Sequence, residues 1–373
     1  MRVLVAPDKF KGTLSAPEAA AAIARGWRVG DPSADVEEVP LADGGEGTLD
    51  ALLAARGGVR RSESVTGPLG EPVEAAFGLV DAPGGRLGVV EMARASGLQL
   101  VPGDRRDPRV TTSRGTGELM LAAVRAGAVR LLVCVGGSAT NDAGAGAAQA
   151  LGVHLLDGRG DELRPGGAAL QDLERADLSG VLPEMRNVPI EVAVDVDNPL
   201  VGPKGASAVY GPQKGASPGD VEALDHALRR FAEVVARDTD VDVAPLTGGG
   251  AAGGLPAGLA AFFRASLRSG LELVMDAAGL RERLRGTALV VTGEGTFDEQ
   301  SLRGKVPGGV IAAARAADVP RVVIFCGAAD LAPPDGVTVR SLTSRFGAEA
   351  AVGRAEALLE QLAAEVASTS EQG

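Results

Sequence analysis

The stretch VVTGEGTFDEQSLRGK, residues 290–305, places an apolar run directly before glycines, carboxylates and a Gly-Lys pair. It has the outline of a phosphate-binding loop, but a P-loop requires G-x-x-x-x-G-K followed by Ser or Thr. Glu299 stands where the first glycine should be, and Val306 follows Lys305. The stretch is therefore predicted to be a strand followed by a polar loop, and its carboxylates become its informative residues.

Other apolar runs along the chain end in polar, glycine-rich segments in the same way. Short β-branched runs that alternate with Ala-rich helical stretches are typical of an α/β architecture with a mainly parallel sheet. The clearest predicted strands cover residues 2–6, 131–135, 190–194, 288–292 and 321–325.

Two helices are indicated by local signals near the N-terminus. Ser15 and Glu18 have the spacing of a capping box and open an alanine-rich helix that runs to about Arg25. A second helix, TLDALLAARGG, follows the glycine turn ADGGEG and is expected to close at Gly57 and Gly58.

The pattern changes between about residues 62 and 100. SVTGPLGEPVEAAFGLV and RLGVVEM are interrupted by Gly and Pro, and they are typical of antiparallel strands rather than βα units. This break predicts a second domain inserted into the first, with the C-terminal third returning to the N-terminal fold. The glycine-rich segment 248–254 is predicted to be a hinge.

The length, charge and amino-acid composition of the chain exclude some classes of partner and favour a two-domain protein. The chain has 373 residues, which favours two domains, and a formal net charge of −12, which argues against a nucleic-acid or anionic membrane partner. Aromatic residues make up only 3%, too few for stacking bases. With no signal peptide or long apolar run, we expect a cytoplasmic protein. Cys134 and Cys326 lie in strand-like runs and are expected to be buried thiols.

Lysines and carboxylates gather in the segments that follow the predicted strands. Ligands of doubly wound sheets bind beyond the carboxyl ends of the strands, so these segments are expected to share a site. Phosphoryl transfer needs this mixture, because carboxylates hold Mg²⁺ and cations neutralise the moving phosphoryl oxygens. The residues concerned are Asp8, Lys9, Lys11, Asp43, Glu46, Asp195, Asp197, Lys204, Lys214, Glu294, Asp298 and Lys305.

Some of these residues have an equally simple structural explanation. Asp43 fits an ordinary turn, and Glu46 fits the first turn of a helix, where the helix dipole favours a carboxylate. The segment GGSATNDAGAG is more specific, because Ser138, Thr140, Asn141 and Asp142 crowd a presumed helix N-terminus, where hydroxyls and free N–H groups suit an anion.

Eight collinear stretches together resemble the bacterial glycerate kinase family of the glyoxylate and glucarate pathway type, almost from end to end. They are APDKFKGTLSA (6–16), PLADGGEGT (40–48), EMARASGL (91–98), TSRGTGEL (112–119), GGSATNDAGAG (136–146), DVDNPLVGPKGASAVYGPQKGA (195–216), GGGAAGGL (248–255) and TGEGTFDEQSLRGKVPGGV (292–310).

This resemblance implies an ATP- and Mg²⁺-dependent kinase that phosphorylates D-glycerate. The expected product is 2-phosphoglycerate rather than 3-phosphoglycerate. It also implies an α/β fold in which a Rossmann-like parallel sheet domain, residues 1–62 and 285–373, carries an inserted α/β domain, residues 63–284. The active site is expected in the cleft between the two domains.

Roles can then be assigned as hypotheses. Asp195 is the predicted general base or Mg²⁺ ligand, with Glu294 and Asp298 as further Mg²⁺ ligands. The lysines predicted to act in catalysis are Lys9, Lys11 and Lys214. The residues predicted to bind substrate or nucleotide are Asp8, Asp43, Glu46, Arg114, Ser138, Thr140, Asn141, Asp142 and Lys305.

Two other classes of protein compete with the kinase. A non-catalytic sensor of a sugar acid or nucleotide would explain the glycines and lysines but not the number of loop carboxylates. A dinucleotide oxidoreductase would need G-x-G-x-x-G after the first strand, where PDKFKG stands instead. The expected partners are D-glycerate and ATP, and the sequence leaves room for a homodimer.

Overall fold

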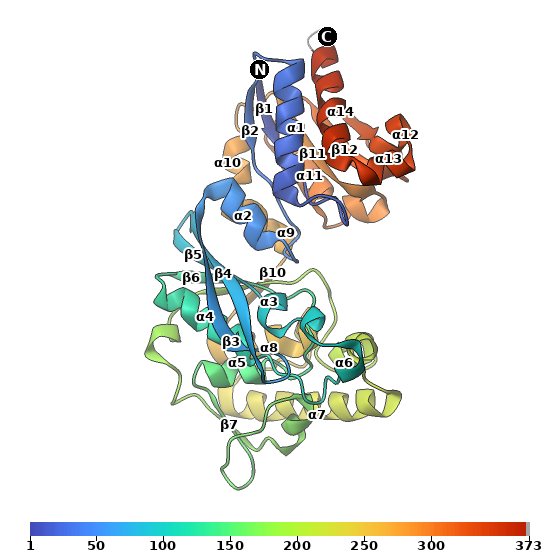
Figure 1. The fold of residues 1–373 in the computed structure, drawn as a ribbon. Helices are drawn as coiled ribbons and strands as arrows, with labels where there is room; N and C mark the ends of the chain where they lie inside the picture. The colour runs from blue at the N-terminus through green and yellow to red at the C-terminus, as the bar shows by residue number, and fades with distance from the viewer. Residues whose placement is uncertain (371–373) are drawn as a thin grey trace. The chain divides into compact units, whose positions relative to one another are not determined.

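The computed structural model describes residues 1–370, and these form two compact units. Unit 1 consists of residues 1–43, 50–57 and 271–370, and unit 2 consists of residues 44–49 and 58–270. The chain passes from unit 1 to unit 2 at residues 43/44, returns at 49/50, crosses again at 57/58 and comes back to unit 1 at 270/271. Both units combine helices with a sheet, as the α/β prediction requires (Figure 1).

Unit 1 is built on a five-stranded parallel sheet with the order β13-β12-β11-β1-β2. Its strands are β1 (Arg2–Val5), β2 (Asp35–Glu38), β11 (Leu289–Phe297), β12 (Val322–Ala329) and β13 (Val337–Ser341). Its helices are α1 (Ala16–Gly30), α2 (Thr48–Arg56), α9 (Gly270–Ala278), α10 (Leu280–Leu284), α11 (Val306–Ala316), α12 (Leu342–Phe346), α13 (Ala348–Gly353) and α14 (Ala355–Ser370), of which α2 and α9 begin at residues of unit 2.

Unit 2 is built on a six-stranded mixed sheet with the order β10-β9-β6-β5-β4-β3. Its strands are β3 (Gly58–Thr66), β4 (Pro72–Ala82), β5 (Gly85–Glu91), β6 (Arg130–Cys134), β9 (Ile190–Ala193) and β10 (Ser266–Arg268), with β7 (His154–Leu156) and β8 (Arg175–Asp177) in a separate pair. Its helices are α3 (Ala93–Ser96), α4 (Arg114–Arg125), α5 (Ala145–Ala150), α6 (Ala206–Tyr210), α7 (Pro218–Thr239) and α8 (Leu255–Phe263).

The predicted strands and the predicted antiparallel region are confirmed, with one correction: β11 runs on to Phe297, so Glu294, predicted to follow the strand, lies within it. β3 pairs with β4 and β4 with β5 in antiparallel fashion, whereas β5, β6, β9 and β10 run parallel to one another. The capping box at Ser15 and Glu18 is also present, with each residue bonding the backbone N–H of the other. Helix α1 extends past the predicted end at Arg25 because its last turns bury Gly26 and Trp27.

Two sequence-based interpretations were wrong. Gly57 ends α2 with a positive φ of 76°, but Gly58 does not close the helix, because it is the first residue of β3. The segment 248–254 is not a hinge between the units, since it lies wholly inside unit 2. A Cβ on Gly253 would stand 2.0 Å from the Thr140 carbonyl oxygen, so the small residues serve close backbone packing.

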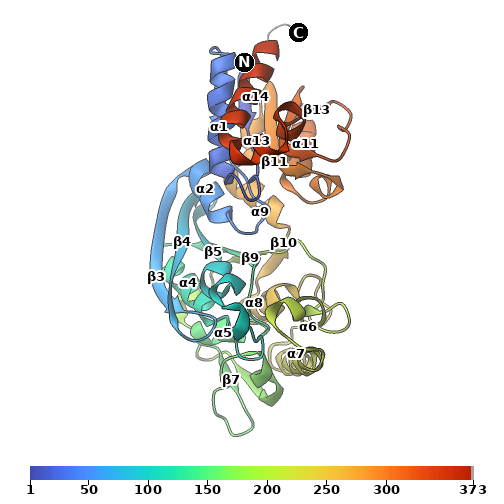
Figure 2. The ribbon, with the colours of Figure 1, turned by 45° about the vertical axis from the view of Figure 1, so that its right-hand side comes forward.

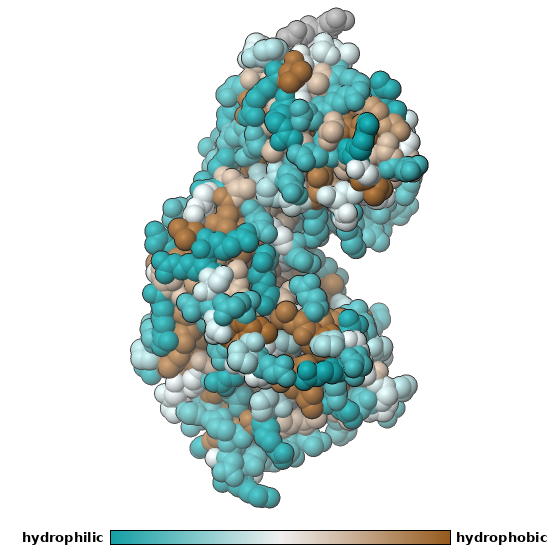
Figure 3. Space-filling view, in the orientation of Figure 1, coloured by the Kyte–Doolittle hydropathy of each residue, from teal (hydrophilic) through white to brown (hydrophobic). Residues whose placement is uncertain are grey.

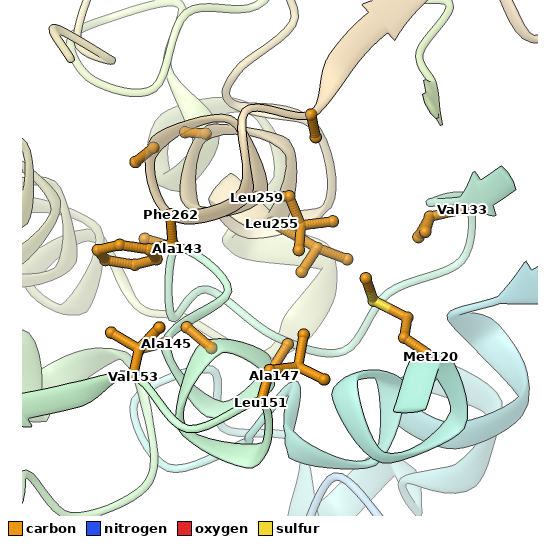
Figure 4. Close-up of a cluster of buried hydrophobic side chains, with 14 of the residues drawn as sticks. Met120, Val133, Ala143, Ala145, Ala147, Leu151, Val153, Leu255, Leu259 and Phe262 are labelled. Carbon is orange, nitrogen blue, oxygen red and sulfur yellow. The ribbon is translucent and has the colours of Figure 1, made fainter. Parts of the chain in front are cut away.

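Each unit has its own hydrophobic core. In unit 1, Trp27, Phe10 and Phe325 pack with aliphatic residues of the parallel sheet and of α14. In unit 2, helices α4, α5 and α8 meet through a cluster that includes Met120, Leu255 and Phe262 (Figure 4). Cys134 and Cys326 are buried free thiols, as predicted. Polar side chains cover most of the face in Figure 3.

Helices α1 and α14 lie side by side and in direct contact (Figures 1 and 2). The contact needs Gly26, because a Cβ there would stand 2.0 Å from the Glu360 carbonyl oxygen and 2.9 Å from the Ala363 Cβ. Helical backbones come this close only where one of them lacks a side chain, so Gly26 fixes the distance between the two helices.

Gly26→Ala is expected to lower the free energy of unfolding by about 1–3 kcal/mol, the usual cost of overpacking. Gly353→Ala, on α13 of the same unit, is the matched control, because nothing lies within 4 Å of the added Cβ. Denaturant titration followed by circular dichroism checks both. Equal unfolding midpoints for the two variants would contradict the close contact.

Candidate functional site

The order of strands in unit 1 reverses between β1 and β11. From β1 the chain continues to β2 on one side, and from β11 it continues to β12 and β13 on the other. In open parallel sheets ligands bind beyond the carboxyl ends of the strands at such a reversal. Asp8 follows the end of β1, and its N–H donates to the Gly293 carbonyl of β11 at 2.8 Å.

Three carboxylates meet at this point. Asp8 and Glu294 are both only 6% exposed, and Asp43 is half-buried. Burial raises the pKa of Asp8 to about 7, with a further contribution from the charge of Asp43 and a smaller one from Glu294, against hydrogen bonding and charge from Lys9. Their side chains are therefore close enough to repel one another electrostatically.

Glu294 is a buried carboxylate that lies within strand β11. Burial raises its pKa, and the charge of Asp298 adds to the shift, whereas Ser301 and Lys305 oppose it. Its Oε1 is buried and has no hydrogen-bond partner among residues 1–370. A buried carboxylate oxygen without a donor is costly, and such an atom points to a ligand or cation that would complete it.

Asp298 is held in place by the backbone that follows it. Its Oδ1 accepts from the N–H groups of Gln300 at 2.8 Å and Ser301 at 3.1 Å, which caps a 3-10 turn at Glu299–Leu302. Burial alone would raise its pKa, but these N–H groups and the charge of Lys305 outweigh it and hold the pKa below the usual value.

The lysines of unit 1 differ in exposure. Lys9 and Lys305 are half-buried beside the carboxylates, and Lys305 is the N-cap residue just before α11. Lys11 is exposed in the same loop as Lys9. The structure thus brings together six of the predicted site residues in unit 1, namely Asp8, Lys9, Asp43, Glu294, Asp298 and Lys305.

A second group of predicted residues gathers in unit 2. Lys214 is 1% exposed, and its Nζ donates to Ser138 Oγ at 2.9 Å and to the Thr140 carbonyl at 2.7 Å. Burial lowers the pKa of Lys214 to about 7, partly offset by the charge of Asp142. In this arrangement the Lys214 ammonium holds the loop that precedes α5.

Asp142 anchors the same loop. It is buried, and Oδ2 accepts from the N–H of Ser113 at 2.9 Å, from its hydroxyl at 2.8 Å and from the N–H of Gly146 at 3.3 Å. Burial raises the pKa of Asp142, and these donors work against the shift. Beside it, Thr140 Oγ1 and Asn141 Oδ1 are buried without a partner in the described chain.

The remaining predicted residues belong to unit 2 and are exposed. Asp195 is exposed after β9, and its Oδ1 accepts from the Gly270 N–H at 2.9 Å and from Ser269 Oγ at 3.3 Å. Arg114 is exposed and pairs with Glu118 at 3.1 Å. Glu46 is exposed in the ADGGEG turn.

Glu91 was missed by the sequence analysis. It ends β5 and is 2% exposed, and its Oε1 accepts from the N–H groups of Gly47 at 2.9 Å and Leu49 at 3.0 Å, while Arg94 donates to Oε2. It thereby holds the ADGGEG turn. The strand-end rule that selected the other carboxylates would have found it, but its strand lies in the antiparallel region, where the rule was not applied.

Comparison with known proteins gives the family. The model of the Glycerate kinase family matches residues 3–372. The chain belongs to the glycerate kinase family. It is 50% identical to the glycerate kinase of Bacillus subtilis over 87% of this chain and 84% of that one. It is 51% identical to the glycerate 2-kinase of Escherichia coli over 83% and 81%, respectively.

A solved structure supports the same assignment. The crystal structure of a candidate glycerate kinase 2 from Salmonella typhimurium LT2 has a TM-score of 0.91 and 46% sequence identity, and the match covers 100% of this chain and 99% of that one. The α/β fold is therefore that of a glycerate kinase. As a member of this kinase family, the protein is a phosphotransferase, and a sensor without catalysis is no longer a competing interpretation.

Residues 1–370 were searched for groups of metal-binding side chains and for helices that could span a membrane. No group of three or more His, Cys, Asp or Glu side chains in this range is arranged to hold a metal ion. None of the helices described here is long and apolar enough to span a bilayer.

The raised pKa of Asp8 predicts a pH-dependent stability of the metal-free protein. The unfolded chain loses the Asp8 proton near its ordinary pKa of 3.8 and the folded chain near 7. The folded state binds more protons at Asp8 between these values, so the contribution of Asp8 to stability is most favourable below about pH 4 and falls as pH rises to about 7. Asp8→Asn should remove a loss on the order of a few kcal/mol.

Denaturant titrations at pH 5 and pH 8 in EDTA measure this effect. Asp8→Asn should lose less stability over this interval than the unaltered protein. Asp335→Asn, an exposed aspartate of the same unit, should follow the unaltered protein. A pH response of Asp8→Asn equal to that of the control would show that the folded environment does not hold the Asp8 proton.

Proposed function

We propose that the protein transfers the γ-phosphoryl group of ATP to D-glycerate in a Mg²⁺-dependent reaction. The favoured product is 2-phosphoglycerate, because the name of the Escherichia coli relative, at 51% identity, specifies a glycerate 2-kinase. The observation that carries the proposal is the meeting of carboxylates and lysines at the strand reversal of unit 1. Because the proposed cosubstrate is ATP, we infer action in the cytoplasm.

The carboxylates of unit 1 suit Mg²⁺. Mg²⁺ takes hard oxygen ligands, keeps several waters and is usually bound through one or two protein carboxylates plus substrate phosphates. Glu294, with its unpartnered buried Oε1, and Asp298, fixed by its cap, would supply two such carboxylates. When bound, the ion would neutralise charge on the phosphate oxygens.

The lysines beside them suit the phosphates. Lys9 and Lys305 are already close enough to the acids to lower their pKa values, so their charges act at this point of the unit. We assign both to the phosphate groups. Lys11, exposed in the loop that carries Lys9, is assigned to the same task. Asp8 and Asp43 would orient the lysines and share the charge of the site.

The loop of unit 2 suits a small polar ligand. Thr140 Oγ1 and Asn141 Oδ1 have no partner in the described chain, and Ser138 of the same loop accepts a hydrogen bond from Lys214. We assign Ser138, Thr140, Asn141 and Asp142 to ligand binding. The burial and two hydrogen bonds of Lys214 favour a positioning role, in which its ammonium sets the shape of the loop, over direct charge neutralisation.

Asp195 stays a proposed general base or metal ligand. Its exposure after β9 leaves it accessible to a ligand, but its Oδ1 also accepts from Gly270, the residue at which the chain leaves unit 2. The alternative role is therefore positional, with Asp195 holding the end of the β10–α9 connection. Arg114 and Glu46 are exposed, and we keep both as proposed binding residues.

The activity itself is tested by ADP release from ATP and Mg²⁺. We expect release that depends on D-glycerate and stops when Mg²⁺ is chelated. Phosphorus NMR of the product should show a phosphate on the secondary carbon, as in 2-phosphoglycerate. A phosphate on the primary carbon would overturn the regiochemistry alone, whereas the absence of D-glycerate-dependent release would overturn the proposed substrate.

Glu294→Gln is expected to raise the Mg²⁺ concentration required for half-maximal activity at least about tenfold, because one charged oxygen ligand is lost. Asp298→Asn should act in the same direction. The matched control is Glu299→Gln, an exposed neighbour in the same segment, which should leave the Mg²⁺ requirement unchanged. An unaltered requirement in both Glu294→Gln and Asp298→Asn would remove the metal role.

The same titration separates the roles of Asp195. As a general base it should lose about 10²–10⁴-fold in kcat when changed to Asn, without a change in Mg²⁺ requirement. As a metal ligand it should shift the Mg²⁺ requirement. Asp240→Asn, at an exposed aspartate that follows α7 in the same unit, is the control. Near-normal kcat and Mg²⁺ requirement in Asp195→Asn would leave it only the positional role.

A further inference from the structure

Strand β3 is the outer edge of the six-stranded sheet of unit 2. It has β4 on one side, and no strand of residues 1–370 lies on the other. Figure 2 shows it as the outermost strand of its sheet. Its nine residues are exposed except for Val65 and the half-buried Thr66. Long exposed edges invite pairing with another strand, and proteins normally cover or shorten them.

The backbone groups that face outward can be assigned from the pairing with β4. The Gly67 N–H donates to the Glu71 carbonyl at 2.7 Å, just beyond the Thr66–Pro72 pair. In an antiparallel ladder hydrogen-bonded and non-hydrogen-bonded pairs alternate. The residues of β3 whose N–H and C=O groups point away from β4 are therefore Gly58, Arg60, Ser62, Ser64 and Thr66.

Glu118 provides an independent check on this assignment. Its Oε2 accepts from the Thr66 N–H at 2.7 Å, and its Oε1 accepts from the Thr66 hydroxyl at 3.0 Å. The Thr66 N–H is thus directed away from β4, as the alternation requires. It also means that the exposed ladder ends at Thr66, which limits the length over which another strand can pair.

We propose that β3 pairs antiparallel with β3 of a second copy of this chain, about a two-fold axis through Ser62, and joins the two sheets into one. Two-fold symmetry brings each residue opposite the one equally distant on the other side of Ser62. Ser62 then faces Ser62 of the second copy, with outward N–H and C=O groups on both. This inference does not depend on the proposed reaction.

The side chains of β3 are self-complementary in this register. Arg61 lies opposite Glu63 of the second copy, and Val59 lies opposite Val65. Opposite charges and paired aliphatic residues directly across a strand boundary stabilise a sheet. Arg61 and Glu63 also belong to the non-hydrogen-bonded pairs of the new ladder, where facing side chains are closest.

The other symmetric registers are less favourable. An axis through Arg60 or Arg61 places arginine opposite arginine, and one through Glu63 places glutamate opposite glutamate. An axis through Ser64 places Glu63 opposite Val65. Like charges directly opposite one another destabilise a sheet. The sequence of β3 therefore selects the Ser62 register, and the same charges disfavour the slipped pairings that lead to aggregation.

A groove beside β3 gives the facing side chains room. It has a volume of about 400 Å³ and lies on the face that carries Arg61, Glu63 and Val65, with α4 as its other wall. Leu121, Ala122 and Ala126 of α4 contribute apolar surface to it, and Arg125 and Glu118 contribute charge. Helix α4 leaves this face of β3 open, and the Arg61–Glu63 pairs would cover the opening.

Sedimentation equilibrium of the full chain tests the proposal. We expect the unaltered protein to be a dimer. Arg61→Glu and Glu63→Arg should each raise the dimer dissociation constant at least about tenfold, because each variant places like charges opposite one another in both symmetric pairs. The double variant, which restores opposite charges, should return within about threefold of the original. Glu74→Arg, exposed on neighbouring β4, is the control and should stay dimeric.

Ser62→Pro provides a second measurement that does not depend on charge. The Ser62 N–H points away from β4, so proline there removes a donor to the second copy without removing one from β4. This variant should be monomeric with the circular dichroism spectrum of the folded protein. A monomeric unaltered protein, or a dimer that resists all these substitutions, would overturn the proposal.

Discussion

The parallel pairing of β1 with β11 is the constraint on which the rest of unit 1 depends. It joins residues 3–5 to residues 289–291, which lie 286 positions apart in a chain of 373. Because β2 lies outside β1, and β12 and β13 lie outside β11, this pairing creates the reversal of strand order. The buried acids Asp8 and Glu294 meet because their strands meet. The position of the candidate site is therefore a property of the sheet rather than of either loop.

Local sequence signals predicted the features whose causes are local. The capping box at Ser15 and Glu18 needs only four neighbouring residues, and the position of Asp298 needs only a strand followed by a loop. The resemblance to the glycerate kinase family, carried by eight collinear stretches of sequence, added the expected two-domain α/β fold. The capping box and the strand-end carboxylate could be predicted from the sequence, because neither feature depends on which distant segments come together in the fold.

The features that were missed or misjudged arise from packing between distant segments. The glycines at 248–254 look flexible in the sequence, yet Gly253 is small because the Thr140 backbone lies against it. Lys214 resembles any other loop lysine, and its burial follows from the position of Ser138 in the folded unit. Glu91 binds a turn more than forty residues earlier in the chain. None of these contacts leaves a periodic or local trace in the sequence.

The division of the chain into a continuous and a discontinuous unit has a consequence for synthesis on the ribosome. Unit 2 is almost entirely one uninterrupted segment, so its strands can pair as soon as they emerge. Strand β1 emerges first and can pair with β2 soon afterwards, but its other partner, β11, follows 286 residues later. Long-range pairing is slow, and unpaired apolar strands are exposed to misassembly in the meantime. The N-terminal segment therefore carries a folding hazard, because one side of β1 stays unpaired until β11 has been made.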